Sequence, residues 1–182
     1  MTRETVCFEI DPYRDGLSPA DLKRELGLPS SSQAKLQDIL GYLDQDERQI
    51  MMFLFGLGPR QHGVGSSVAT ICLFHLQVAE AEAVRMLDLA FQKLRKIVGT
   101  QQLMRALGAP EGHVVDPHDV MTKAQFEPFE RQIVQKLFML SGLRKHDRAD
   151  VIREFGEYGI TEDNANSVVA QLMGRMREFT AV

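Results

Sequence analysis

Apolar residues recur at helical spacing along much of the chain, and the clearest stripe lies in residues 43–57. Asp44 precedes the stripe as a favourable N-cap, Glu47 lies three residues later as in a capping box, and Gly56 follows as a helix stop. The apolar members of the stripe are Ile50, Phe53, Leu54 and Leu57. The pattern predicts an amphipathic helix.

A second stripe predicts a helix over residues 78–95, with apolar positions at Val84, Leu87, Phe91 and Leu94. Basic side chains crowd its C-terminal end, where they complement the helix dipole: Lys93, Arg95 and Lys96. Between the two stripes, residues 58–67 contain several glycines and predict a loop. Ser66 or Ser67 then caps a short helix.

The N-terminal part predicts an arm and two helices. Residues 1–15 alternate apolar and polar positions before a proline turn, which is typical of a short extended arm that pairs with a partner or packs on the body. Ser18 and Pro19 begin a helix, and a second helix continues to Leu43 after a glycine-containing break. Such a pair fits a helix-turn-helix or a helical hairpin that supports the next module. In the first case three exposed polar side chains could bind bases or phosphates: Gln33, Lys35 and Gln37.

The composition shifts to Gly, Pro and His over residues 99–125, which predicts a linker between two domains. Residues 126–182 then repeat parts of the earlier sequence. The segment 130–133 is identical to the segment 47–50, Glu-Arg-Gln-Ile, at an offset of 83. The segment 175–177 follows the related segment 93–95 at an offset of 82. Two matches at nearly one offset predict a duplicated unit.

The second copy has the residues of a helix-turn-helix. Gly156 and Gly159 form the turn, Thr161 is a suitable N-cap, and a buried stripe follows at Val168, Leu172, Met176 and Phe179. Its exposed face offers side chains that could contact bases, namely Asn164, Asn166 and Ser167. A basic cluster precedes it and fits either a phosphate contact, an acidic protein surface or a solvated loop: Arg144, Lys145, His146 and Arg148.

Composition limits the function classes. The chain has 182 residues, 44% of them hydrophobic, and a net charge of −4, which is ordinary for a globular protein and disfavours a general nucleic-acid coat. Cys7 and Cys72 lack metal-ligand spacing, and no signal peptide precedes them, so we expect a cytoplasmic protein. No apolar run reaches the roughly 20 residues of a membrane span. No catalytic constellation is present, so we expect no enzyme activity, cofactor, metal or small-molecule substrate.

Two segments resemble region 4 of bacterial sigma factors, the promoter-recognition subunits of RNA polymerase. The first is Phe55-Gly56-Leu57, and the second is Ala90 followed by Lys93-Leu94-Arg95. The resemblance covers residues 36–98 and implies an all-α fold of tandem helix-turn-helix modules. The expected domains are an extended arm at 1–15, a helical pair with the sigma-like module at 16–98, the linker at 99–125 and the second module at 126–182.

The sequence departs from the family where the recognition helix begins. Sigma factors have a capping Ser or Thr there, followed by arginine and other polar side chains that read the promoter. This chain has Ala79-Glu80-Ala81-Glu82 instead. Carboxylates suit a helix N-terminus but repel phosphates, so the resemblance implies weakened promoter reading.

The resemblance therefore implies a sigma-factor-like transcription protein that docks on RNA polymerase or another transcription component. In the family, a hydrophobic surface of region 4 receives the flap-tip helix of the β subunit. The matching residues here are Leu36, Ile39, Leu40, Leu43, Ile50, Phe53 and Leu54. The same residues could close an ordinary core. The alternatives are a sequence-specific regulator that binds promoter DNA through the first or last helix-turn-helix, and an interaction protein without a link to polymerase.

Overall fold

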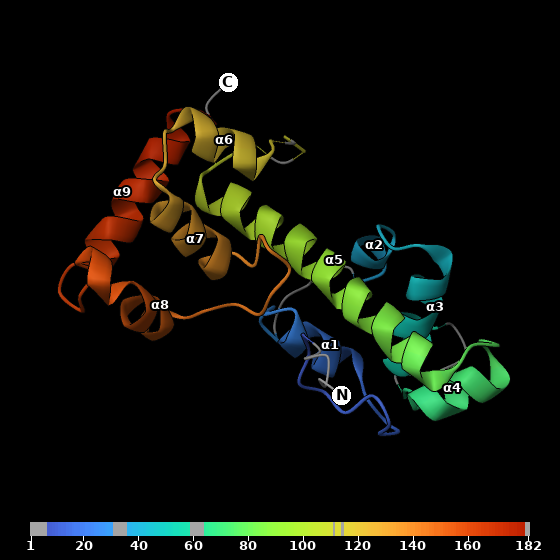
Figure 1. Ribbon diagram of the computed structural model, residues 1–182. Helices are drawn as coiled ribbons and strands as arrows, with labels where there is room; N and C mark the ends of the chain where they lie inside the picture. Colours follow the sequence, from blue (N-terminus) through green and yellow to red (C-terminus); the bar gives the residue numbers. More distant parts are fainter. Residues whose placement is uncertain (1–6, 31–35, 59–63, 111, 114, 181–182) are drawn as a thin grey trace. The chain divides into compact units, whose positions relative to one another are not determined.

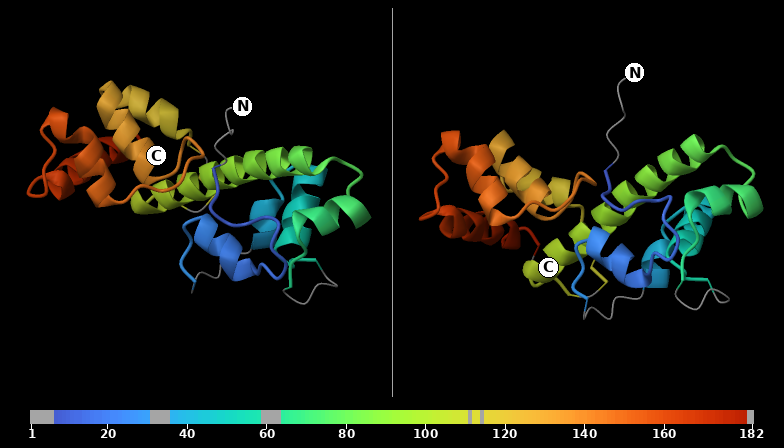
Figure 2. Two further views of the ribbon diagram at one scale, coloured as in Figure 1. Left: turned by 60° about the horizontal axis from the view of Figure 1, so that its bottom comes forward. Right: turned by 90° about the horizontal axis from the view of Figure 1, so that it is seen from below.

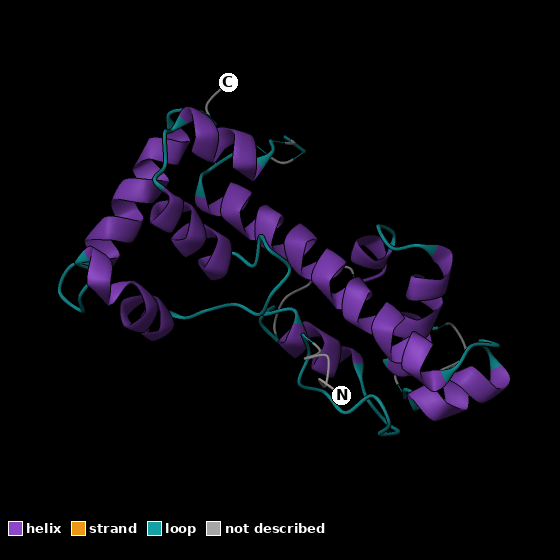
Figure 3. Ribbon diagram, in the orientation of Figure 1, coloured by secondary structure: helices purple, strands orange, loops and turns teal. Residues whose placement is uncertain are grey.

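The computed structural model describes residues 7–30, 36–58, 64–110, 112–113 and 115–180. All regular structure in these ranges is helical, which confirms the predicted all-α class (Figure 1, Figure 3). The chain divides into two compact units, Met1–Arg95 and Lys96–Val182. The helix α5 is continuous, and its residues belong partly to each unit (Figure 2).

The first unit contains four short helices and the N-terminal part of α5. Their bounds are α1 Pro19–Glu25, α2 Leu36–Leu40, α3 Gln45–Leu54, α4 Val68–Phe74 and α5 Glu80–Ala106. The predicted starts of α1 and α3 are confirmed, because Ser18 and Asp44 are N-caps and each closes a capping box. Ser67 caps α4 and accepts a hydrogen bond from the backbone N–H of Thr70 at 3.3 Å.

The second unit contains the rest of α5 and four more α-helices. Their bounds are α6 Pro117–Lys123, α7 Pro128–Leu137, α8 Arg148–Phe155 and α9 Ala165–Arg177, with a 3-10 helix at Gly156–Tyr158. The predicted N-cap at Thr161 is wrong. Its backbone N–H donates to the Asn164 side chain at 2.8 Å, and Asn164 is the N-cap of α9. Phe179 lies beyond the helix end and is exposed, so it does not belong to the buried stripe.

A buried ion pair holds the N-terminal segment and α1 against α5 in the first unit. The Arg95 guanidinium is fully buried and donates to the Glu25 carboxylate at 3.0 Å. It also donates to the Cys7 carbonyl at 2.6 Å. The second Glu25 carboxylate oxygen accepts from the backbone N–H groups of Glu9 and Ile10, each at 3.0 Å. The Arg95 Nε also donates to the Glu25 backbone carbonyl at 3.3 Å, so each guanidinium nitrogen and each carboxylate oxygen has a partner, as burial of an ion pair requires.

The described part of the predicted N-terminal arm, residues 7–15, contains no strand. It packs on the first unit. Phe8 is buried with its ring centroid 5.3 Å from that of Phe91, and the turn predicted at Asp11 is present. The hydrogen bonds that a strand would have made are replaced by bonds to Glu25 and Asp88.

The ends of α3 and α7 have the same geometry. Gly56 has φ 65° and its counterpart Met139 has φ 53°. The next backbone N–H reaches back five residues in both cases, from Leu57 to Met52 at 2.8 Å and from Leu140 to Gln135 at 2.9 Å. This is the Schellman arrangement that satisfies free carbonyls at a helix end. Met139 adopts the left-handed conformation without being glycine, and its side chain is buried.

The match between units begins earlier than residue 126. The end of α1 reads Leu-Lys-Arg-Glu-Leu-Gly-Leu-Pro from residue 22, and the end of α5 reads Leu-Met-Arg-Ala-Leu-Gly-Ala-Pro from residue 103. Gly27 and Gly108 have φ of 66° and 73°, and the hydrogen bonds at the two helix ends correspond. We infer that both units are copies of one five-helix arrangement, in which the C-terminal part of α5 takes the place of α1.

The structure accordingly differs from the linker predicted at residues 99–125. The last turns of α5 and all of α6 lie in this range, and their apolar side chains belong to the core of the second unit: Leu103, Met104, Leu107, Val120, Met121 and Ala124. A Cβ atom at Gly99 would lie 1.6 Å from the Phe138 carbonyl oxygen, so α5 packs closely against the end of α7. The glycines and prolines of this range mark helix ends and starts within one unit.

One ion pair also recurs. In the first unit the capping-box residue Glu47 lies 2.7 Å from the Lys93 ammonium on α5. In the second unit the capping-box residue Glu130 lies 2.8 Å from the Arg175 guanidinium on α9. Each pair joins the start of the third helix of its unit to the fifth helix. The hydrogen bond and the charge of Glu47 raise the pKa of Lys93, because they stabilise the ammonium.

We expect the buried pair to be the most sensitive polar contact of the first unit. Replacing Arg95 by Met leaves the Glu25 carboxylate buried without a cation and should lower the free energy of unfolding by about 3 to 5 kcal/mol. Arg177, its counterpart in the second unit, is exposed, so Arg177→Met should cost less than about 1 kcal/mol. Urea unfolding followed by circular dichroism suits a chain without tryptophan.

Adding Glu25→Gln to Arg95→Met removes the stranded charge and should restore part of the loss. Equal effects of Arg95→Met and Arg177→Met would contradict a structural role for the buried pair.

Candidate functional site

Six of the seven residues predicted to receive the polymerase flap are buried in the core of the first unit: Leu36, Ile39, Leu40, Leu43, Ile50 and Leu54. Phe53 is half-buried. Its ring stacks on the ring of His75 at a centroid distance of 4.0 Å, at the contact between α3 and the end of α4. In this structure, Phe53 is therefore the member of the set with substantial exposed surface.

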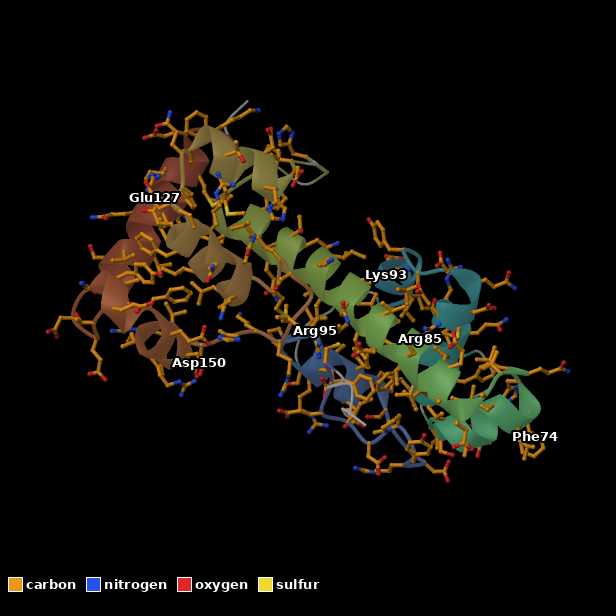
Figure 4. All side chains as sticks on the ribbon, in the orientation of Figure 1. Phe74, Arg85, Lys93, Arg95, Glu127 and Asp150 are labelled. Atoms are coloured by element: carbon orange, nitrogen blue, oxygen red, sulfur yellow. The ribbon has the colours of Figure 1, made fainter. Side chains whose placement is uncertain are left out.

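The end of α4 exposes apolar side chains that the sequence did not single out. Leu73 is 75% exposed and Phe74 is 71% exposed, and Figure 4 shows Phe74 projecting from the end of α4. Val78 follows in the turn before α5 and is also exposed. The helix has seven residues and buries only Val68 and Ile71. An apolar run in so short a helix indicates such exposure, because one face alone can reach the core.

The start of α5 carries the two predicted carboxylates. Glu80 is exposed, and Glu82 accepts a hydrogen bond from Arg85 at 3.0 Å. Burial and the nearby Glu80 carboxylate raise the pKa of the Cys72 thiol on α4. Glu80 also follows the exposed residue Val78 by two positions, so its charge lies next to that residue in the chain.

The residues predicted to contact DNA near the N-terminus are only partly described. Gln33 and Lys35 lie outside the described residues. Gln37 is exposed on α2, beside the exposed carboxylate Asp38. The described part of this predicted site thus offers a polar amide next to a negative charge, which opposes phosphate binding.

The basic cluster of the second unit lies in the loop before α8 and in the first turn of that helix. Arg144, Lys145 and Arg148 are exposed. The Arg148 guanidinium donates to the Glu162 carbonyl and so joins the start of α8 to the loop before α9. His146 is half-buried, and its Nδ1 atom lies 3.1 Å from the Glu154 carboxylate. Hydrogen bonding from Lys136, with the charges of His146 and Arg153, lowers the pKa of Glu154.

The three polar residues predicted on the last helix have different roles. Asn164 accepts from the Thr161 backbone and donates to the Gly159 carbonyl at 2.7 Å, so its amide holds the loop before α9. Asn166 and Ser167 are exposed in the first turn of α9. The exposed carboxylates of Glu162 and Asp163 precede them.

Other chemistry has little support among the described residues. In those ranges no group of three or more His, Cys, Asp or Glu side chains could hold a metal ion. Asp116 caps α6 and accepts a hydrogen bond from the His118 backbone N–H at 2.9 Å. Burial and a hydrogen bond to Asp88 raise the pKa of the Cys7 thiol to about 12, so it stays protonated at neutral pH. Across the described part of the chain, no helix has both the length and the apolar character that crossing a bilayer requires.

Comparisons with protein-family models, with curated proteins and with solved structures give no match for this chain. The site geometry and the resemblance of the two short motifs are therefore the grounds for a proposed function.

We expect the carboxylates at the start of α5 to oppose DNA binding. Replacing Glu80 and Glu82 by Arg should raise the affinity for mixed-sequence DNA and steepen its salt dependence by about 0.9 in log–log slope for each new phosphate contact. Fluorescence anisotropy at several salt concentrations measures this slope.

The matched control replaces Asp46 and Glu178 by Arg, two exposed carboxylates outside α5, and changes the net charge equally. Equal slopes for the two double variants would show that net charge, and not the start of α5, sets the DNA affinity.

Proposed function

We propose that this chain is a sigma-factor-like transcription protein, built from tandem helix-turn-helix modules, that docks on RNA polymerase or another transcription component. Promoter reading is weakened in this proposal. The resemblance over residues 36–98 supplies the functional class, and α3, α4 and the N-terminal part of α5 lie within these residues.

The acidic start of α5 is the observation that carries the proposal. The family presents basic and polar side chains to the major groove at this point, whereas Glu80 here is exposed and Glu82 is paired with Arg85. A carboxylate near phosphates and guanine acceptors is unfavourable. The same helix start can face a protein that carries Lys or Arg, so retained docking with weakened DNA reading fits this charge pattern.

Six of the predicted docking residues are buried, so we do not include them in the proposed contact. Their side chains stabilise the first unit, and a groove made from them would require the unit to open. Phe53 is different, because its ring is half-buried and stacks on the exposed residue His75. We place the docking contact at this aromatic pair.

The second candidate function is a sequence-specific DNA-binding regulator that uses α8 and α9. The exposed side chains Lys145, Arg148, Asn166 and Ser167 favour it, because they combine phosphate-binding and base-reading groups on the last two helices and in the loop before α8. The neighbouring carboxylates Glu162 and Asp163 oppose it. A steep salt dependence of DNA binding that Lys145→Ala reduces would favour this function over docking.

A truncation of Phe53 separates docking from core packing. If the ring anchors polymerase, Phe53→Ala should stay folded and lose at least about 2 kcal/mol of binding free energy, roughly thirtyfold in Kd. Phe129→Ala is the matched control, since Phe129 is a half-buried ring stacked on Tyr158 at 4.6 Å in the other unit. Retention on immobilised core polymerase, beside a thermal melt of each variant, measures both effects.

Two outcomes oppose the proposal. If core polymerase does not retain the wild-type protein at low salt, the protein does not dock on polymerase. If the Phe53 and Phe129 variants are retained equally, the docking contact does not lie at Phe53 and His75.

A further inference from the structure

We propose that the exposed apolar residues at the end of α4 dock a basic amphipathic helix of a partner protein. We call Leu73, Phe74 and Val78 the α4 surface. This inference does not rest on the proposed function, because it holds whether or not the partner belongs to the transcription machinery.

The two units provide an internal comparison for the α4 surface. α4 and α8 are the fourth helices of their units, each begins with a capping residue, and Ile71 and Val151 are buried at the fourth helical position of each. Counted from the caps, Leu73 matches Arg153 and Phe74 matches Glu154. The same arrangement therefore accepts charged residues at these positions, so the fold does not require the apolar pair. Exposed apolar residues that folding does not require indicate a binding surface.

The charge around the α4 surface identifies the partner's chemistry. Glu80 is exposed at the start of α5, two residues after Val78. Residues 64–82 contain no Lys or Arg, and Glu82 is paired with Arg85, so the exposed Glu80 supplies the negative charge of this segment. An anionic membrane would be repelled by this charge. A two-fold contact between two copies would place the same acidic surface against itself. A helix with an apolar stripe and flanking Lys or Arg complements both the apolar and the acidic features.

The experiment uses the full chain and a defined probe. The probe is a fluorescein-labelled peptide of about 18 residues, or five helical turns, with Leu at i, i+3, i+4 and i+7 and Lys elsewhere. A second peptide has Glu in place of every Lys. Fluorescence anisotropy titrations should show binding of the Lys peptide and at least about tenfold weaker binding of the Glu peptide.

The decisive variant is Leu73→Arg with Phe74→Glu. It gives α4 the residues that α8 has at the matching positions. It should fold as the wild type does, and its affinity for the Lys peptide should fall at least about tenfold, as expected for lost anchor residues. Leu89→Arg with Leu143→Glu is the control, because it changes exposed apolar residues elsewhere by the same charges and should leave the affinity unchanged. Glu80→Gln should weaken binding by about two- to fivefold. If the decisive variant fails to fold, Leu73→Ser alone carries the same test.

Three results would overturn the inference. The first is that the double variant Leu73→Arg with Phe74→Glu binds the Lys peptide as tightly as the wild type does. The second is binding of phosphatidylserine vesicles that this variant abolishes, since a membrane would then be the ligand. The third is a dimer of the wild type, measured by sedimentation, that becomes a monomer in the variant.

Discussion

Most helices of this structure are too short to be stable alone. Among the described residues, seven of the nine α-helices have ten residues or fewer. Helices of this length are not stable alone in water, because nucleation costs more than a few hydrogen bonds return. Their stability must come from capped ends and from burial of one face. The capping boxes at Asp44 and Glu127 and the left-handed residues Gly56 and Met139 meet the first need.

Both units meet the constraint in the same way, and their differences point to function. Each ties its third helix to its fifth through one ion pair, Glu47 with Lys93 and Glu130 with Arg175. The first unit adds the buried Arg95 and Glu25 pair and exposes apolar residues at the end of α4. The corresponding arginine and α4-like positions of the second unit are solvated and charged. The charged residues at the α4-like positions indicate that the arrangement does not require the exposed apolar residues of α4.

The sequence predicts those features of the fold that depend on residues close together in the chain. The caps at Ser18 and Asp44 depend on neighbouring residues and are confirmed. The linker prediction failed because glycine and proline mark helix ends inside a unit as well as boundaries between units; the match between the segments at residues 22 and 103 is the signal that corrects it. An amphipathic stripe cannot separate core from groove, so the burial of Ile50 and its neighbours required the structure. The Arg95 and Glu25 pair joins residues 70 positions apart, beyond any local pattern.

We infer that the second unit begins within α5 and repeats the whole arrangement of the first. Thermal melting of two fragments, followed by circular dichroism, tests this inference. A fragment of residues 96–182 keeps Leu103, Leu107, Val120 and Met121 and should be helical and melt cooperatively. A fragment of residues 126–182 lacks these core side chains and should be largely unfolded. Cooperative melting of the shorter fragment, or an unfolded longer fragment, would show that the second unit does not begin within α5.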